Sequence, residues 1–172
     1  MNDKPIVNIN DVPARENKKG SRFAFTALRA GGAVGAKALG ATYMIVPPGR
    51  TAFPRHCHHN NEEMFIILEG TGTYRKGDDS WDVKPGDVVS ALPGGVETAH
   101  ILVNTGSTEL KYWSLSTRND PDICEYPDSG KYMVASGIPQ NGGMANAQFV
   151  LRGRDTTPLD YYDGEDIGEE QK

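Results

Sequence analysis

Short segments of β-forming residues, separated by turns rich in glycine and proline, recur along most of the chain. The clearest of them span residues 39–46, 63–69, 87–92, 98–103 and 109–115. They recur about every ten residues, and no segment with the period of an amphipathic helix lies between them. This spacing predicts an all-β fold, an antiparallel sandwich or barrel, rather than a parallel sheet covered by helices.

The N-terminal end of the chain lacks this rhythm. Residues 1–20 are polar and predict an N-terminal arm, either a mobile tail or a segment that docks on a neighbouring molecule. Residues 21–30 predict a strand. The glycine- and alanine-rich residues 30–40 predict a loop, because each internal glycine costs a helix about 1 kcal/mol. We therefore expect the barrel to span residues 21–118.

Beyond residue 118 the β pattern weakens. Residues 119–131 are expected to form a loop, residues 132–135 one more strand, and residues 140–147 a flexible segment. We expect residues 119–172 to form a C-terminal extension that packs on or beside the barrel, with an acidic end that frays from about residue 163.

Composition and charge exclude several classes of protein. The chain has 172 residues, of which 37% are hydrophobic and 24% charged, as is typical of one globular domain. The net charge is -5 and no basic cluster is present, so neither nucleic acid nor an anionic membrane surface is an expected partner. The longest apolar run, residues 64–68, is too short to span a bilayer, and the N-terminus lacks the pattern of a signal peptide. We therefore expect a cytoplasmic protein in which Cys57 and Cys124 are free thiols.

The candidate chemistry lies between residues 56 and 100, which contain all four histidines of the chain. On a strand, His56 and His58 project to the same face. Glu63 follows after a turn and can fold back beside this pair, and His100 lies on a later strand. Imidazoles and a carboxylate are suitable ligands for a divalent first-row transition metal. The sequence thus predicts a metal site formed by His56, His58, Glu63 and His100.

Several neighbouring residues have a simpler interpretation. The alternative for the histidine pair is two surface histidines on an edge strand. Cys57 and His59 project away from the pair, so Cys57 is expected to pack and His59 to face solvent or support the site from outside. Phe65 and Ile67 share the parity of Glu63 and are expected to line the barrel interior.

Three further residues are candidates for inward positions. Tyr43 and Trp113 could form pocket walls, but we expect them to be ordinary core residues. Asn104 shares the parity of His100 and is expected to be a polar group that points inward.

Two motifs in this region resemble those of the cupin superfamily. The first comprises Gly49, His56, His58, Glu63 and Gly70, and the second comprises Gly86, Pro93, Gly95, His100 and Asn104. Only Glu63, and not Glu62, leaves the family's six residues before Gly70. The chain has one extra residue before His56, one before Pro93 and two before His100, mostly in turns. The resemblance covers residues 38–116.

The resemblance implies a double-stranded β-helix barrel with one metal inside. Only one pair of motifs is present, so the chain resembles a one-barrel cupin, a class that is usually homodimeric. The metal would be one divalent transition ion, such as iron, manganese, nickel or zinc. Residues 121–131, PDICEYPDSGK, are similar to a subgroup of bacterial one-barrel cupins sometimes labelled sugar-phosphate isomerases.

Three functions are compatible with these ligands. The first is a metal-dependent enzyme, of isomerase or epimerase type, that acts on a small oxygen-rich metabolite such as a sugar or sugar phosphate. The second is an iron-dependent dioxygenase with the same four ligands. The third is a non-catalytic protein that binds a small molecule and uses the metal as a structural pin. The sequence shows no general base beside the ligands, so the catalytic residues are not assigned.

Overall fold

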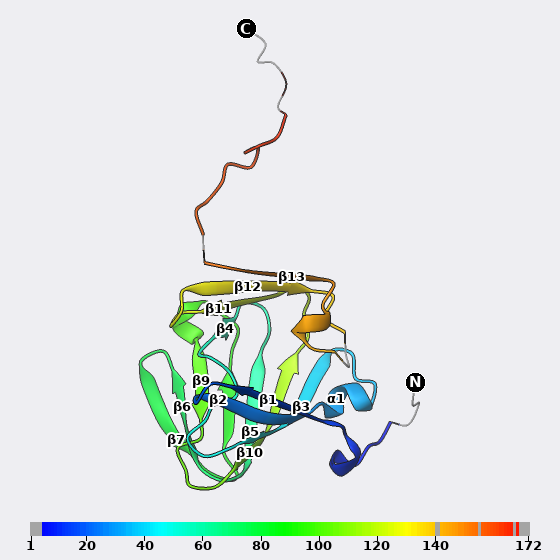
Figure 1. The fold of residues 1–172 in the computed structure, drawn as a ribbon, viewed down its shortest axis with the longest axis vertical. Helices are drawn as coiled ribbons and strands as arrows, with labels where there is room; N and C mark the ends of the chain where they lie inside the picture. Colours follow the sequence, from blue (N-terminus) through cyan, green and yellow to red (C-terminus); the bar gives the residue numbers. More distant parts are fainter. Residues whose placement is uncertain (1–4, 140–141, 155, 167, 169–172) are drawn as a thin grey trace.

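The computed structural model describes residues 5–139, 142–154, 156–166 and 168. It is an all-β barrel whose strands form two layers around a hydrophobic core, as the spacing of the β segments predicts (Figure 1). No helix in the described part of the chain is long and apolar enough to cross a membrane.

Three sheets build the barrel. The six-stranded sheet has the order β1 (Ala14–Lys19), β2 (Phe23–Leu28), β3 (Leu39–Val46), β10 (Leu110–Thr117), β5 (Glu63–Glu69) and β8 (Val88–Ala91). The three-stranded sheet has the order β7 (Asp79–Val83), β6 (Gly72–Lys76) and β9 (His100–Val103). The four-stranded sheet has the order β13 (Phe149–Gly153), β12 (Lys131–Ser136), β11 (Asp122–Tyr126) and β4 (Cys57–His58). Short helical turns lie at Ile9–Asp11, Ala30–Ala33 (α1), Val96–Thr98 and Met144–Asn146.

The core lies where alternate residues of the two layers meet. Phe65 and Ile67 of β5 are 7% and 1% exposed, which confirms the inward parity predicted for them. They pack in one cluster with Met44 of β3 and Tyr112 of β10. Alternation along these strands fixes which other side chains face inward, including Glu63.

The prediction for Tyr43 and Trp113 is wrong. They are register partners on β3 and β10 and alternate with the buried residues Met44 and Tyr112, so they project from the outer face of the sheet. Their rings pack edge to face at 5.4 Å and remain partly exposed. Both faces of these strands carry apolar residues, so the sequence alone does not identify the inner face.

Other differences from the predicted elements occur near the ends of the barrel. The polar residues 14–19 form β1, which pairs along its full length with β2 although every side chain of β1 is exposed. Backbone pairing with β2 holds this edge strand, and Gly20 with a φ of 58° makes the turn between them. Residues 30–33, predicted as loop, form the single turn α1.

The C-terminal part contains more β structure than its sequence suggests. Residues 122–126, predicted as loop, form β11, and residues 149–153 form β13. Strand β12 confirms the strand predicted at residues 132–135. Because β11 pairs with β4, the last three strands lie across one end of the barrel (Figure 1).

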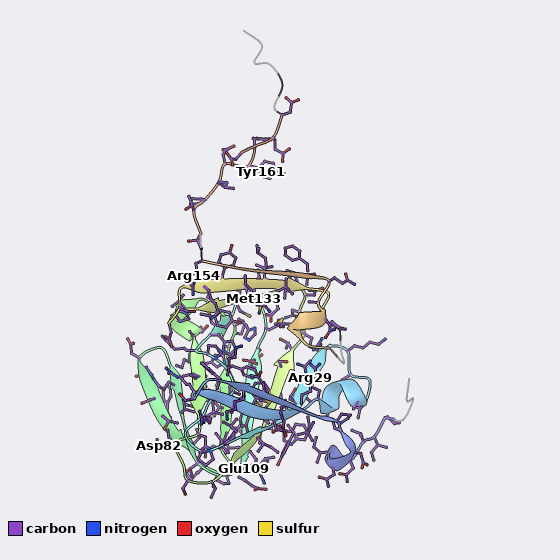
Figure 2. All side chains as sticks on the ribbon, in the orientation of Figure 1. Arg29, Asp82, Glu109, Met133, Arg154 and Tyr161 are labelled. Atoms are coloured by element: carbon purple, nitrogen blue, oxygen red, sulfur yellow. The ribbon has the colours of Figure 1, made fainter. Side chains whose placement is uncertain are left out.

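Beyond β13 the described chain runs away from the barrel. Figure 2 shows Tyr161 on this segment, where 89% of the residue is exposed. The end that we expect to fray from about residue 163 falls partly outside the described residues, since residues 167 and 169–172 are not described.

Candidate metal centre

Backbone pairing brings His56 and His100 together. His56 and His100 are direct antiparallel partners, with hydrogen bonds from His56 N to His100 O at 3.0 Å and from His100 N to His56 O at 2.8 Å. Directly paired residues of antiparallel strands carry their side chains on the same face. Accordingly, the two imidazole rings lie 5.0 Å apart. His58, two residues after His56, projects to the same side, with its ring 5.0 Å from that of His56.

Glu63 reaches this group of histidines from another sheet of the barrel. It opens β5 in the six-stranded sheet and shares the inward face with Phe65. Its Oε2 atom lies 3.1 Å from His100 Nε2, 3.5 Å from His58 Nε2 and 3.8 Å from His56 Nε2. The structure therefore brings together all four residues that the sequence predicts as ligands.

The other nitrogen of each imidazole has an oxygen acceptor. Nδ1 of His56 donates to Pro54 O at 2.8 Å, Nδ1 of His58 to Asp122 Oδ1 at 2.8 Å, and Nδ1 of His100 lies 3.4 Å from Thr98 O. In the tautomer with the proton on Nδ1, each Nε2 would offer its lone pair to a metal ion lying between the imidazoles and Glu63. Histidines that bind metals have the same arrangement, in which the outer nitrogen donates to a carboxylate or a carbonyl.

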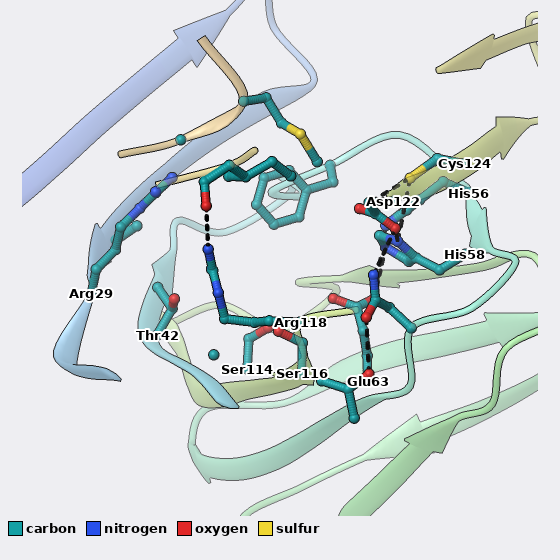
Figure 3. A pocket seen from close by; sticks show the side chains of 18 of the residues that line it. Arg29, Thr42, His56, His58, Glu63, Ser114, Ser116, Arg118, Asp122 and Cys124 are labelled. Carbon is teal, nitrogen blue, oxygen red and sulfur yellow. Dashed lines mark hydrogen bonds and ion pairs between the residues drawn. The ribbon is translucent and has the colours of Figure 1, made fainter. Parts of the chain in front are cut away.

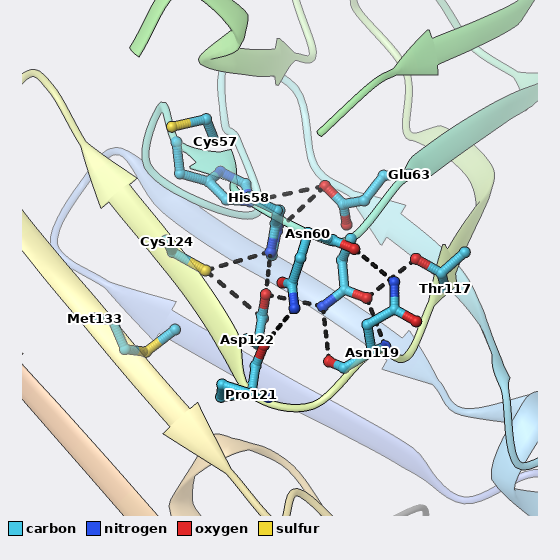
Figure 4. Close-up of polar contacts among 12 residues, drawn as sticks. Cys57, His58, Asn60, Glu63, Thr117, Asn119, Pro121, Asp122, Cys124 and Met133 are labelled. Atoms are coloured by element: carbon cyan, nitrogen blue, oxygen red, sulfur yellow. Dashed lines mark hydrogen bonds and ion pairs between the residues drawn. The ribbon is translucent and has the colours of Figure 1, made fainter. Parts of the chain in front are cut away.

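The support for His58 extends into a wider polar network (Figure 4). Asp122 is 6% exposed, and its Oδ1 also accepts a hydrogen bond from Asn61 Nδ2 at 2.9 Å. Cys124 Sγ lies 3.3 Å from His58 Nδ1 and 3.6 Å from Asp122 Oδ2. Thr117 in turn donates to Asn61. These contacts fix the orientation of the His58 ring.

The pKa values reflect this dense group of charges. Burial by itself would raise the pKa of Glu63, but the hydrogen bond with His100 and the nearby His58 and His56 outweigh it and lower the pKa to about 2. Burial lowers the pKa of His56 to about 4. Burial also acts to lower the pKa of His58, yet the hydrogen bonds with Asp122 and Cys124 prevail and raise it to about 11. Glu63 is therefore a carboxylate at neutral pH.

The donor atoms are spaced as metal ligands require. With metal–ligand bonds of about 2.1 Å, two donors lie about 3.0 Å apart at a right angle and about 3.4 Å apart at the tetrahedral angle. The separations of 3.1 Å, 3.5 Å and 3.8 Å from Glu63 Oε2 are close to these values. His56, His58 and Glu63 have donor atoms that all lie within 4.8 Å of one another, and His100 joins them through Glu63. His56, His58 and Glu63 thus have the spacing of ligands of one divalent metal, and His100 adjoins this group through its contact with Glu63.

Part of the chain matches a known family of domains. The sequence matches the cupin domain over residues 42–116, a range that contains all four of these residues. Residues 42–116 form a cupin domain. The chain thus has the double-stranded β-helix fold that the two motifs imply.

Individual relatives share parts of this chain. An uncharacterized protein of Methanocaldococcus jannaschii is 36% identical over 85 residues, which are 47% of this chain and 65% of that protein. A sugar phosphate isomerase from the cupin superfamily of Silicibacter pomeroyi superposes with a TM-score of 0.73 at 21% identity, over 91% of this chain and 98% of that one. A candidate sugar phosphate isomerase of Acidithiobacillus ferrooxidans superposes with a TM-score of 0.70 at 22% identity, over 86% and 92% of the two chains. At these identities the two structures show a shared fold.

The residues around the ligands take the positions that strand alternation predicts. Cys57 is completely buried and, like Cys124, is a free thiol, as expected. His59 points away from the candidate metal ligands, and its Nε2 atom lies 2.7 Å from Glu125 Oε1. Cys57, His59 and Glu125 form a separate group of possible ligands on that face. Glu62 is exposed, so Glu63 is the acid that faces the histidines.

Asn104 points inward, as predicted, but its contacts are structural. It is completely buried, donates to Val46 O and to Thr108 O at 2.8 Å each, and accepts from Gly106 N at 3.0 Å. These bonds hold the turn before β10 and do not reach the candidate ligands.

A pocket of about 510 Å³ opens onto the candidate ligands. His56, His58 and Glu63 lie on its wall, whereas His100 lies deeper, beside a cavity of about 20 Å³ that it shares with Phe65 and Tyr112. The volume is in the range of small-molecule sites, about 300–1,000 Å³. Access from solvent thus reaches one side of the ligand cluster.

The sequence did not identify several residues of this pocket. Asp122, Cys124 and Tyr126 of β11 line it, together with Arg29 and Arg118. Alternation in the segment DICEY was the available signal, because Asp122, Cys124 and Tyr126 share one parity. That signal could not show that β11 pairs with β4 and so faces the histidines.

Proposed function

We propose that this protein is a metal-dependent enzyme, of isomerase or epimerase type, acting on a small oxygen-rich metabolite. The observation that most supports this proposal is that His56, His58 and His100 converge on one oxygen of Glu63 beside a pocket of the size that binds small molecules. These four residues would hold a divalent iron, manganese, nickel or zinc ion. Such an ion acts as a Lewis acid that polarises a carbonyl or hydroxyl oxygen.

The protein's own groups have separate tasks in this proposal. Asp122 holds the His58 ring in the tautomer that exposes Nε2, and main-chain carbonyls do the same for His56 and His100. The hydroxyl groups of Ser114 and Ser116 lie on the pocket wall, where they can donate to or accept from hydroxyl groups of a substrate. A sugar or a sugar phosphate has the size and the oxygen content that such a pocket accepts.

The first experiment measures the metal. Elemental analysis of the purified wild-type protein should find about one divalent metal ion per chain, whereas the His56→Ala, His100→Ala double variant should have lost it. Glu63→Gln should lower the affinity for metal, and Glu62→Gln, with its exposed side chain, is the matched control. Equal metal content in the wild type and the double variant would refute the site.

The second experiment measures turnover. The metal-loaded protein is incubated with aldose and ketose phosphates in deuterated water, and NMR follows interconversion and exchange of carbon-bound hydrogen. Interconversion by the wild type, absent from the double variant, supports the proposal. Oxygen uptake instead would indicate a dioxygenase, and ligand-induced stabilisation without turnover would indicate a non-catalytic binder.

The homodimer implied by the family resemblance and the cytoplasmic location stay predictions. A measurement of the mass in solution at micromolar concentration tests the former, and cell fractionation tests the latter.

A further inference from the structure

Arginine side chains gather on the wall of the pocket that faces the candidate metal ligands. Arg29 and Arg118 lie on one side in Figure 3, whereas His56, His58 and Glu63 lie on the other. Arg118 follows β10 with the same parity as the pocket residues Ser114 and Ser116, and Arg29 directly follows β2. Strand alternation and the end of a strand therefore direct both side chains into the pocket.

The guanidinium groups converge. A methyl group added at Gly143 would lie 2.8 Å from Arg29 Nη2 and 3.5 Å from Arg15 Nη1, so both arginines border the same point. Burial, followed by the charges of Arg15 and Arg118, lowers the pKa of Arg29. Three like charges are thus close enough to repel one another.

No carboxylate compensates these charges among the described residues. None of the ion pairs there includes Arg15, Arg29 or Arg118. Arg118 Nη2 donates to Ile138 O at 2.9 Å, and Arg29 Nη1 donates to Gly142 O. Each guanidinium has five N–H donors, so these single bonds leave most of them available. Arg29 and Arg118 are partly buried, and partly buried like charges without a counterion are costly, so a bound anion would remove that cost.

The carboxylates that do line the pocket are committed elsewhere. Asp122 binds His58, and Glu63 contacts the three imidazoles. Asp120 accepts from Gly137 N and Ser136 Oγ. The arginine end of the pocket is therefore its anion-accepting end.

We propose that Arg29 and Arg118, assisted by Arg15, form a subsite for the phosphate group of a phosphate-monoester substrate. The proposal rests on the proposed function and names the substrate class of the same site. The carbon chain would cross the pocket past the hydroxyl groups of Thr42, Ser114 and Ser116 (Figure 3) and present its other oxygens to His56, His58 and Glu63. A phosphate monoester carries two charges and three terminal oxygens, which match several guanidinium groups better than a carboxylate does.

The test uses inorganic phosphate as the probe, with affinity measured by calorimetry on the metal-loaded and on the metal-free protein. The wild type should bind phosphate in the millimolar range or tighter in both forms, and more tightly than acetate. Arg118→Met and Arg29→Met should each weaken phosphate binding about 10-fold to 100-fold, because each removes a charged hydrogen-bond donor. Arg154→Met is the matched control, since Arg154 also donates to a main-chain carbonyl but does not line the pocket.

Each other outcome has a definite meaning. The proposal is refuted if the wild type does not bind phosphate, if acetate binds equally well, or if both arginine variants retain wild-type affinity. A purely structural role in holding Ile138 and Gly142 would lower the metal content and the melting temperature of the variants, and Arg118→Lys would not restore phosphate binding. Phosphate binding is also measured on the metal-free protein, so the two proposals can fail separately. If the purified wild type held no metal but bound phosphate through these arginines, the proposed function would be refuted and the phosphate subsite would stand.

Discussion

Asp122→Asn tests how the chain supports its candidate metal ligands. The amide keeps an oxygen that can accept from His58 Nδ1 and Asn61 Nδ2, which now lie 2.8 Å and 2.9 Å from Asp122 Oδ1. The new amide nitrogen would face Cys124 Sγ, 3.6 Å from the present Oδ2. The substitution therefore removes one negative charge and leaves the shape of the network unchanged.

For the deprotonated histidine, we expect the variant to bind metal about 10-fold to 100-fold more weakly, because loss of a carboxylate behind a ligating histidine costs about that much. Such a loss corresponds to about 1.4–2.7 kcal/mol. The carboxylate makes the His58 ring more basic, which favours the metal but also favours a competing proton.

The sign of the pH dependence follows from the competing proton. In the metal-free wild type, burial is outweighed by the hydrogen bonds with Asp122 and Cys124, and the pKa of His58 is about 11. Protons therefore compete with the metal at every pH below about 11. Without the carboxylate this pKa falls, and competition ends at a lower pH. The ratio of wild-type to variant affinity should thus fall as the pH falls from 8.5 to 6.5.

The assay is a competition titration with a chromophoric chelator at several pH values. Glu62→Gln is the control, since it also removes one negative charge near the site but at an exposed side chain outside the groups of possible ligands. A ratio of the two affinities that does not change between pH 8.5 and pH 6.5 would contradict this account of His58.

Three further predictions concern the barrel. Ile67→Ala, at a site that is 1% exposed, should lower the free energy of unfolding by about 2–5 kcal/mol in denaturant titration, whereas Leu68→Ala, 39% exposed, should cost much less. Gly70→Ala should lower the free energy of unfolding more than Gly49→Ala. Both glycines have a positive φ, which costs a residue with a side chain about 1–3 kcal/mol, but only at Gly70 would the new methyl group also meet the backbone of Glu109. Equal costs of the two substitutions would refute the steric argument. Removing the metal should lower the melting temperature by about 5–10 °C relative to protein with metal at 100 times the dissociation constant, since such binding stabilises by about 2.7 kcal/mol; an unchanged melting temperature would indicate that no metal binds the folded state.

The site shows where sequence reasoning succeeds. His56 and His58 are two residues apart on an extended segment, so their shared face follows from strand geometry alone. The inward parity of Glu63, Phe65 and Ile67 follows in the same way. The spacing of two motifs then added His100, whose contact with Glu63 depends on long-range pairing.

The same reasoning fails where the answer depends on distant parts of the chain. Tyr43 and Trp113 lie on strands with apolar residues on both faces, and closure of the barrel alone decides which face is buried. Residues 122–126 contain polar residues that resemble a loop, and they become a strand because β4 and β12 pair with them on both sides.

Sequence by itself determined the class of fold, the four candidate ligands and the inner face of β5, because alternation and motif spacing are local properties of a strand. Tertiary structure alone decided that Asp122 stands behind His58 and that Arg29 and Arg118 share a pocket with the ligands. These residues come from segments far apart in the chain. Their distances depend on strand order and register, which are set by the packing of the whole barrel and not by any local pattern.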